Sequence, residues 1–247
     1  MAIYKHECFI PLESKATLWR YLDFEKFQSL LETKSLFFCR ADKFSDPFEG
    51  SLPKIEADYR IREEKRIAKS FGREFNEEQA LNNILGLQSL HQRLKRGTTI
   101  NCWHINNNES DAMWRLYLKD NEGAAILTSM EKMYEVIEGT SEKIGSSKVR
   151  YLDYDTEKWH HPLDYPHTGY NLYIPLIHKR IEFHHENEFR LIHDVYDAVD
   201  DKDYWETQAI HKGKLIPVDV KTLYKKYISH QQLTLILRYE LNKCLKI

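Results

Sequence analysis

The chain has 247 residues, of which 42% are hydrophobic, 13% aromatic and 30% charged, and its formal net charge is −2. This composition supports a sizeable core and excludes a membrane-spanning protein, because no apolar run approaches the ~20 residues that a span requires. A net charge this close to zero gives no global attraction for nucleic acid, so only a local basic patch could bind it.

The cysteines bear on the compartment in which the protein works. Cys8, Cys39, Cys102 and Cys244 lie far apart and form no CxxC pair, which argues against a zinc ribbon or a disulfide scaffold. Four free thiols are typical of a reducing compartment. The first ten residues also lack the basic-then-apolar layout of a secretory signal. We therefore expect a cytoplasmic protein that does not associate with a membrane.

The first forty residues alternate between strand and helix patterns. Residues 18–22 (LWRYL) and 35–39 (SLFFC) are short apolar and aromatic segments of the strand type. Between them, apolar residues recur at helical spacing, and Asp23 is a suitable N-cap for that helix. A turn-rich loop with the sequence FSDPFEG follows at residues 44–50.

Residues 53–96 differ in composition from the segments around them. They are charged and helix-favouring, and Gly72 lies near a break in the pattern. We expect two helices packed as a hairpin, inserted between core strands as an insertion or a lid.

The rest of the chain mixes strands and helices without regular βαβ alternation. Strand patterns cover residues 98–105, 122–129, 146–155 and 187–194. Helix patterns cover 110–120, with Ser110 as N-cap, and 130–139, ended by Gly139. Residues 155–170 read as a loop and 171–179 are ambiguous. A hairpin around Lys212 and Gly213 and an amphipathic closing helix over 231–245 complete the chain.

These elements predict an α+β fold. We expect one domain over residues 1–247, with a largely antiparallel mixed sheet, flanking helices and the helical-hairpin insertion at about 53–96.

The stretch FHHENEFRLIHD, residues 183–194, holds two glutamates and an arginine at strand spacing. Glu186, Glu188 and Arg190 would share one strand face, with Phe189 and Leu191 on the other. Two carboxylates this close resist ionising together unless a cation or a ligand intervenes. The face is either a solvated surface on which Arg190 offsets the glutamates, or a site that stabilises a cationic, oxocarbenium-like transition state.

Two arginines in the N-terminal strands raise a similar question. Arg20 lies between Trp19 and Tyr21 in a predicted core strand, so it must reach solvent, a carboxylate or a ligand phosphate. A structural ion pair and a ligand contact both remain open. Arg40, which precedes Asp42 by two residues, raises the same question less strongly.

Residues 102–117, CWHINNNESDAMWRLY, contain aromatic residues and a histidine that could wall a pocket. Trp114 and Tyr117 are three apart on a predicted helix and share a face, although such stripes more often belong to a core. His104 alone is weak evidence for catalysis. Histidine is frequent elsewhere, but no HExxH or comparable spacing is present, so no metal site is predicted. The GxGxxG, GxxxxGK[ST] and GxSxG motifs are absent as well.

Three stretches in order resemble a widespread bacterial family of unknown function. They are LWRYLDFEKFQSLLETKSLFFCRADKFSDPFEG, CWHINNNESDAMWRLYLKDNEGAAILTS and ENEFRLI. The family pattern combines YRY, F-x-DPFEG, W-x-x-Y and E-x-E-[FYW]-R, and the resemblance covers residues from about 18 to 193. It implies no activity by itself.

A more distant resemblance implies one. The order of elements is similar to that of the ADP-ribosyltransferase fold with its Arg–Ser–Glu pattern. In this order, an arginine on a first strand is followed by a helix, a second strand, a later strand ending in Thr/Ser and a final Glu-x-Glu. The resemblance implies NAD as the substrate, with Arg20 at its phosphates or ribose and Glu188 as the catalytic carboxylate. Thr128 and Ser129 would support the site, although LTS is not a full Ser-Thr-Ser.

The same resemblance implies roles for further residues. Glu186 would orient the acceptor nucleophile, Tyr21 or Trp114 would stack on nicotinamide, and Arg190 would belong to the cofactor-binding residues. Other pocket candidates are Asp46, Glu49, Arg40 and His104, and Asp46 could instead organise an Asx turn.

The sequence therefore predicts an NAD-dependent ADP-ribosyltransferase-like enzyme, a toxin or phage-defence effector that acts on a nucleic acid or a protein. One alternative is a nucleic-acid or nucleotide-binding module without catalysis, using the basic segments 65–69, 91–97 and 221–227. Another is a metal-dependent nuclease that uses Asp46, Glu49, Glu186, Glu188 and histidines. A protein that only binds partners is the simplest alternative.

Overall fold

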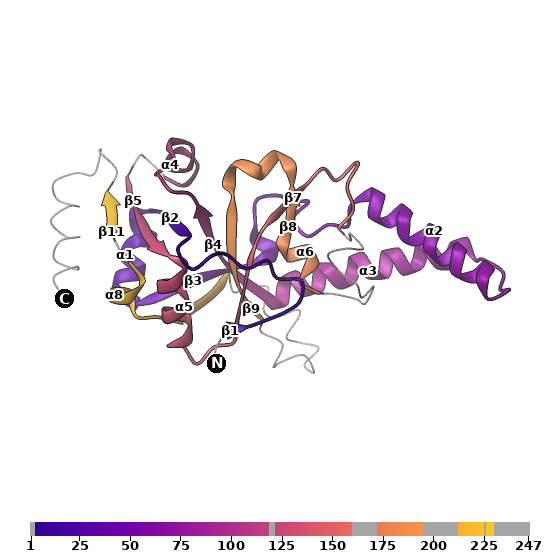
Figure 1. Ribbon diagram of the computed structural model, residues 1–247, viewed down its shortest axis with the longest axis horizontal. Coiled ribbons are helices and arrows are strands. Elements are labelled where there is room, and N and C mark those ends of the chain that lie inside the picture. The colour runs from indigo at the N-terminus through magenta and orange to yellow at the C-terminus, as the bar shows by residue number, and fades with distance from the viewer. Residues whose placement is uncertain (1–2, 119–121, 160–171, 195–211, 225, 230–247) are drawn as a thin grey trace.

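A computed structural model describes residues 3–118, 122–159, 172–194, 212–224 and 226–229. Figure 1 shows a body built around a twisted sheet, with a long helical hairpin protruding from one side. Among the described helices, none is long and apolar enough to cross a membrane.

The described strands form a nine-stranded mixed sheet. Its main path runs through β1 (Ile3–Tyr4), β6 (Ile144–Lys148), β9 (Glu188–Asp194), β4 (Thr98–Ile105), β2 (Thr17–Asp23), β5 (Gly123–Ser129) and β11 (Lys226–Ser229). Strand β3 (Ser35–Arg40) pairs with β4 and with β10 (Gly213–Pro217). Every pair in this sheet is antiparallel except β1 with β6. The α+β class with a largely antiparallel sheet is thereby confirmed.

Strand β4 forks the sheet along one of its edges. Strand β2 pairs with the end of β4, where Trp19 lies opposite His104. Strand β3 pairs with its beginning, where Arg40 lies opposite Thr99. The other edge of β4 is paired with β9 along its whole length. The fork therefore opens next to the middle of a central strand.

The main core lies on one face of the sheet. It joins Phe27 and Leu30 of α1 (Phe24–Thr33) and Met133 of α5 (Met130–Glu138) to Phe189 and Leu191 of β9. Side chains alternate along a strand, so Glu188 and Arg190 point to the opposite face.

Helix ends follow the predicted caps. The Asp23 carboxylate accepts a hydrogen bond from the Lys26 amide at 2.9 Å, and α1 begins after it. Ser110 caps α4 (Asp111–Tyr117) in the same way, and α5 ends at Gly139. The strands predicted at 18–22, 35–39, 98–105 and 122–129 are confirmed.

Two strand predictions are wrong in their extent. The strand expected over 146–155 is broken at Val149 into β6 and β7 (Arg150–Leu152), and β7 pairs with β8 (His178–Arg180) in a separate parallel sheet. Glu186 does not belong to β9, but ends a 3-10 turn (Ile181–Glu186). Asn187 interrupts the strand pattern because its backbone is left-handed (φ 36°), a conformation that asparagine tolerates better than most residues.

Three other predictions concern segments that the structure describes only in part. The ambiguous segment 171–179 contains a short helix, α6 (Ile174–Ile177), followed by β8. The second half of the expected hairpin around Lys212 and Gly213 is β10, which pairs with β3. The first half of that hairpin, most of the loop 155–170 and the closing helix over 231–245 lie outside the described residues.

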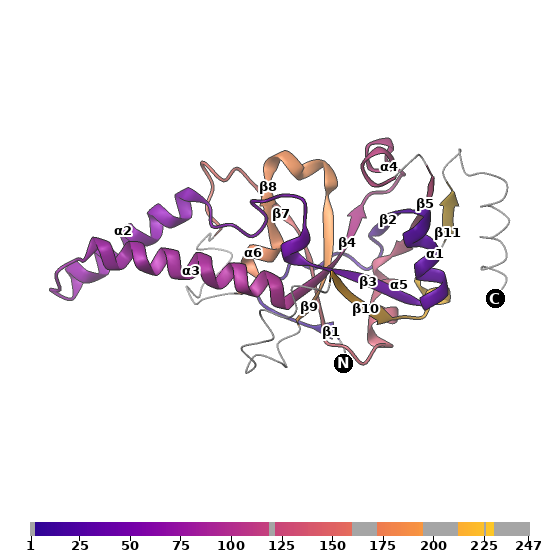
Figure 2. The same cartoon turned by 180° about the vertical axis from the view of Figure 1, so that it is seen from behind.

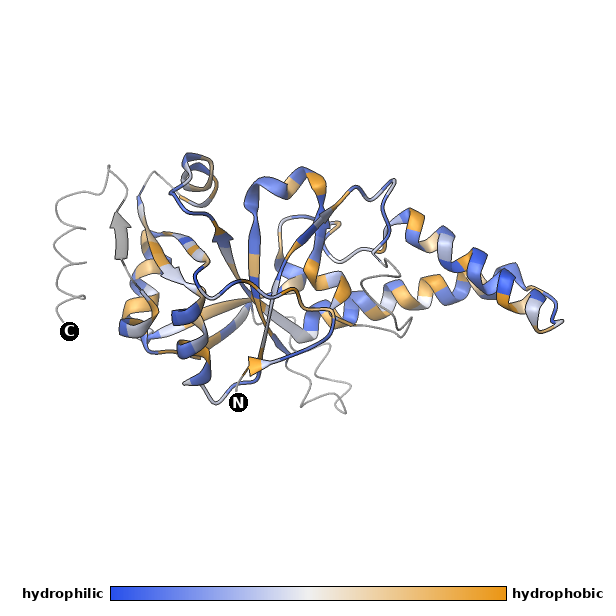
Figure 3. Cartoon of the chain, in the orientation of Figure 1, coloured by the Kyte–Doolittle hydropathy of each residue, from blue (hydrophilic) through white to orange (hydrophobic). Residues whose placement is uncertain are grey.

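The helical hairpin predicted over 53–96 is present. Helix α2 (Lys54–Ser70) and helix α3 (Glu77–Gly97) lie side by side, and Gly72 supplies the left-handed backbone (φ 61°) at the turn. Figures 1 and 2 show the pair projecting away from the sheet. In Figure 3, hydrophilic residues run along both helices and are interrupted by single hydrophobic positions. The outer part of the hairpin projects from the body, whereas Ile84 and Leu87 of α3 belong to a core cluster with Ile100 of β4 and Ile192 of β9, so the base of the hairpin packs against the sheet.

Replacing Phe189 by alanine tests where the core lies. Phe189 is 0% exposed on a central strand, so Phe189→Ala should lower the free energy of unfolding by about 3–5 kcal/mol in urea denaturation. Phe71→Ala at the hairpin tip, where the side chain is 71% exposed, is the control and should change it by less than about 0.5 kcal/mol. Similar losses in both variants would contradict this core.

Candidate functional site

A cavity of about 670 Å³ lies on the face of the sheet that Glu188 and Arg190 share. Strands β2, β3, β4 and β9, helix α4, the turn after β3 and the 3-10 turn before β9 all contribute to its wall. Its volume is typical of small-molecule sites, which range from about 300 to 1,000 Å³.

Five buried charged side chains meet in the wall of this cavity and form what we call the charge cluster: Glu49, Lys179, Glu186, Glu188 and Arg190. The Lys179 ammonium lies 2.8 Å from Glu186 Oε2 and 2.8 Å from Glu188 Oε1. Arg190 Nε lies 2.8 Å from Glu188 Oε2, and Arg190 Nη1 lies 2.7 Å from Glu49 Oε1. Glu49 Oε2 is also 3.8 Å from Lys179.

The charge cluster excludes the solvated strand face as an interpretation. Its members are at most 7% exposed, and Arg190 is only 1% exposed. Three carboxylates face two cations, so the cluster carries one negative charge when all its members are ionised. Burying such a charge is costly unless a ligand or a function compensates for it. Two cluster atoms, Glu49 Oε2 and Arg190 Nη2, also have no hydrogen-bond partner among the described residues.

The two glutamates of β9 and its preceding turn have opposite pKa shifts. Burial, and then the neighbouring Glu188, raise the pKa of Glu186 to about 7. Burial alone would raise the pKa of Glu188 too, but Arg190 and Lys179 hold it well below its usual range. Glu188 therefore stays ionised, while Glu186 can gain and lose a proton near neutral pH.

Lys179 is the functional candidate that the sequence analysis missed. Burial by itself lowers its pKa, but Glu188 and Glu49 raise it above the ordinary value, so the side chain remains an ammonium ion and does not act as a nucleophile. In the sequence it is one of many lysines, within a segment whose structure was ambiguous. Only the pairing of β8 with β7 brings it to the glutamates.

The FSDPFEG motif positions Glu49. Asp46 Oδ1 accepts a hydrogen bond from the Phe48 amide at 3.0 Å, and its carbonyl accepts one from the Glu49 amide at 3.1 Å. Arg180 binds the same carboxylate at 2.9 Å. Asp46 thus forms the Asx turn and also lines the cavity. The turn directs Glu49 to Arg190, which explains two of the predicted pocket residues at once.

Arg20 lines the cavity without a carboxylate partner. Its guanidinium fills the fork of the sheet, donating to the carbonyls of Cys102 at 3.0 Å and Phe37 at 3.3 Å. It also lies over the Trp103 ring at 5.7 Å. Burial lowers the pKa of Arg20. Within the described ranges no carboxylate lies within 4.0 Å of it, so the structural ion pair considered for Arg20 is not present.

Two predicted residues, Arg40 and Trp114, do not line the cavity. Arg40 forms the structural ion pair, with its Nε 2.6 Å from Asp42 Oδ1, and does not line the cavity. Trp114 packs edge-on against Tyr21 with ring centroids 4.9 Å apart, so Tyr21 alone of this pair faces the cavity. The Tyr21 hydroxyl accepts a hydrogen bond from the Ser110 amide at 2.8 Å.

His104 also lines the cavity and holds the turn that carries Glu186. Its Nδ1 donates to the Glu186 carbonyl at 2.7 Å, and its Nε2 accepts from the Asn106 amide group at 3.3 Å. Both ring nitrogens are therefore occupied, which suits a positioning residue better than a proton donor.

Thr128 and Ser129 are not brought to the cavity. Both are buried at the end of β5, opposite Leu18 and Thr17, where β2 begins. The cavity lies farther along β2, at Arg20, and neither hydroxyl residue contributes to its wall. The arginine and glutamate of the Arg–Ser–Glu pattern share one cavity, but the serine does not.

The carboxylates of the charge cluster do not form a metal site. The Lys179 ammonium occupies the position between Glu186 and Glu188 that a cation would need. Across the described ranges, no group of three or more His, Cys, Asp or Glu residues could hold a metal ion. This geometry opposes the metal-dependent nuclease alternative.

The thiols in the cavity wall are protonated. Burial, followed by the nearby Glu188, raises the pKa of Cys102 well above its usual value, and burial also raises that of Cys39. Because the thiolate is the nucleophile, neither cysteine suits covalent catalysis at neutral pH.

In comparisons with known proteins, no protein-family model, no curated protein and no solved structure matches this chain. The resemblances described from the sequence therefore stay predictions, and the function has to be argued from the site.

The raised pKa of Glu186 predicts a pH dependence of stability. The folded protein binds a proton here more tightly than the unfolded chain, whose glutamate pKa is about 4.3, so this contribution to stability is lost as pH rises toward about 7. Between pH 5 and 8, the free energy of unfolding of the wild type should fall relative to that of Glu186→Gln by at most about 3 kcal/mol. If the free energies of unfolding of the two proteins changed in parallel with pH in urea denaturation, the raised pKa of Glu186 would be contradicted.

Proposed function

We propose that the protein is an NAD-dependent ADP-ribosyltransferase-like enzyme that breaks the bond between nicotinamide and ribose. One observation carries the proposal: a buried cluster of three carboxylates and two cations lines the same cavity as an arginine that has no carboxylate partner among the described residues. A substrate with a cationic reacting centre and an anionic diphosphate matches both features.

The charge cluster suits the cleavage step. When the C1′–N bond breaks, nicotinamide leaves with the electron pair of that bond and becomes neutral, and positive charge develops on the ribose. A site that is negative before the reaction stabilises that charge without reorganising. Glu188, which stays ionised, is the residue we assign to the ribose hydroxyl and the developing cation.

Glu186 suits the transfer step. A bond forms between C1′ and the acceptor nucleophile, whose proton must then go to a base. With its pKa raised to about 7, Glu186 can accept that proton at neutral pH and return it to solvent. Lys179, fixed between the two glutamates, positions both carboxylates and is not itself a reacting group.

The cationic side chains of the cavity wall match the negative charge of the NAD diphosphate. Among the described residues, the hydrogen bonds of Arg20 go to backbone carbonyls and not to a carboxylate, so its charge is available to an anion. Lys26 and Lys43 line the same cavity, although each also contacts an aspartate. Tyr21 offers an aromatic wall nearby for the nicotinamide ring. Arg190 forms ion pairs with Glu188 and Glu49, so it stabilises the charge cluster and is not assigned to cofactor binding.

The biological setting belongs to the same proposal. An enzyme of this kind would transfer ADP-ribose to a nucleic acid or a protein in the cytoplasm, as a toxin or a phage-defence effector does.

Substitutions in the cavity test the proposed reaction by nicotinamide release from NAD. Glu188→Gln removes the fixed negative charge and should lower kcat by about 100-fold or more, whereas Arg20→Lys should chiefly raise KM. Glu186→Gln should slow transfer to an acceptor more than it slows cleavage.

Glu32→Gln, on the exposed side of α1, is the matched control and should keep full activity. Thermal melting of each variant separates loss of activity from loss of fold. A folded Glu188→Gln protein that turns over NAD as fast as the wild type would remove the proposal.

A further inference from the structure

The helical hairpin has a charge that differs from that of the rest of the molecule. Residues 53–97 contain ten of the 36 lysines and arginines but only seven of the 38 aspartates and glutamates. The hairpin is therefore positively charged, although the whole chain is negative. Since the hairpin projects from the body (Figures 1 and 2), its positive charge is presented away from the sheet.

Most of the exposed cations of the hairpin have no ion pair. Arg66 binds Glu63 and Arg60 binds Glu56 within α2. In the described part of the chain, seven others have no carboxylate within 4.0 Å: Lys54, Arg62, Lys65, Lys69, Arg73, Arg93 and Arg96. Unpaired surface cations gathered on one element are typical of a surface that binds phosphates.

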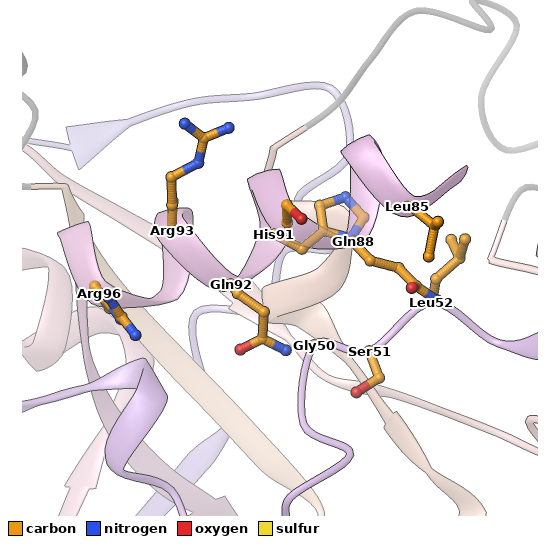
Figure 4. Close-up of a pocket in the computed structure, with 10 residues that line it drawn as sticks. Gly50, Ser51, Leu52, Leu85, Gln88, His91, Gln92, Arg93 and Arg96 are labelled. Carbon is orange, nitrogen blue, oxygen red and sulfur yellow. The ribbon is translucent and has the colours of Figure 1, made fainter. Parts of the chain in front are cut away.

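A groove of about 590 Å³ lies where α3 meets residues 50–52 (Figure 4). Arg93 and Arg96 line it together with the side-chain amides of Gln88 and Gln92. In Figure 4, Gln92 extends from α3 toward Gly50. The groove thus offers guanidinium groups for phosphates and amides for base or sugar atoms.

His91 also lines the groove, as a buried and neutral ring. The side chain is 5% exposed and lines the groove, yet its Nδ1 has no hydrogen-bond partner among the described residues. Burial, followed by the nearby Arg60, lowers the pKa of His91 to about 4, so the ring is neutral at physiological pH. The Nδ1 atom is itself buried, so a ligand in the groove does not reach it.

Aromatic rings accompany the cations at the far end of the hairpin. Phe71 is 71% exposed at the turn, and the Arg73 guanidinium lies 5.6 Å from its ring centroid. Phe75 has the Lys65 ammonium 5.8 Å from its centroid. Exposed aromatic faces beside cations are what single-stranded nucleic acid uses, because each base can stack on a ring while its phosphate meets a charge.

We propose that the α2–α3 hairpin is a binding arm for single-stranded nucleic acid, with phosphates held at Arg93 and Arg96 and a base stacked on Phe71. Helix α3, with 21 residues, is about 30 Å long, so the groove and the tip can contact different nucleotides of one strand. The exposed Phe71 ring favours a nucleic acid over an acidic protein segment, which would need the cations but not the stacking surface.

The groove adjoins the catalytic candidates through one turn. Gly50, Ser51 and Leu52 line the groove, while the preceding Glu49 lies in the charge cluster. Lys95 of α3 donates to the Glu49 carbonyl at 2.5 Å and ties the two together. That the bound strand is also the acceptor of ADP-ribose rests on the proposed function, whereas the binding itself does not.

Fluorescence anisotropy with a labelled single-stranded oligonucleotide of about 20 nucleotides, without NAD, tests the binding arm. The wild type should bind with an affinity that falls steeply with salt. Arg93→Glu combined with Arg96→Glu should weaken binding at least about tenfold and reduce the salt slope by about 1.4, as expected for two lost phosphate contacts. Phe71→Ala should weaken binding severalfold at an unchanged salt slope.

Lys5→Glu combined with Lys15→Glu is the matched control, because both lysines are exposed on the body and the charge change is the same. It should bind within about twofold of the wild type. No oligonucleotide binding by the wild type, equal losses in both double variants, or binding of anionic phospholipid vesicles in place of the oligonucleotide would overturn the proposal. Nicotinamide release is measured separately: a protein that binds the oligonucleotide but does not cleave NAD loses the enzymatic function and keeps the binding arm.

Discussion

The contact of the Lys179 ammonium with Glu186 and Glu188 is the interaction on which the candidate site depends. Without a cation between them, two carboxylates this deeply buried would not both ionise. With it, Glu188 is fixed as a carboxylate, while Glu186 keeps a pKa of about 7. Arg190 and Glu49 extend the contact into a cluster with one surplus negative charge. The proposed chemistry uses that surplus.

The backbone explains why these groups meet. The fork of the sheet at β4 leaves two carbonyls for Arg20, which brings a cation into the cavity. The turn at residues 46–50 carries Glu49 to Arg190, and the left-handed Asn187 lets the chain turn from Glu186 into β9. The fork, the turn and the left-handed residue are each local features. They lie far apart in the sequence, and strand pairing brings them together.

Local patterns predicted local structure well, because caps and strand alternation act over a few residues. Asp23, Ser110 and Gly139 mark helix ends as their chemistry requires, and the contrast between Phe189 and Glu188 follows from alternation. Pairing between distant segments was not predictable in this way. The sequence does not reveal Lys179 as a site residue, because its partners come from another element. Thr128 and Ser129 lie outside the cavity because they pair with the beginning of β2, before Arg20.

Burial of Glu186 and the pairing of Glu188 with Arg190 and Lys179 separate the ionisation of the two glutamates, and carboxyl carbon NMR on glutamate-labelled protein measures this separation directly. We expect one glutamate resonance that titrates near pH 7 and disappears in Glu186→Gln, and a second, lost in Glu188→Gln, that stays ionised down to the lowest pH at which the protein remains folded. If both resonances titrate together near pH 4.3, like exposed glutamates, the cluster does not exist as described and the proposed chemistry has no basis.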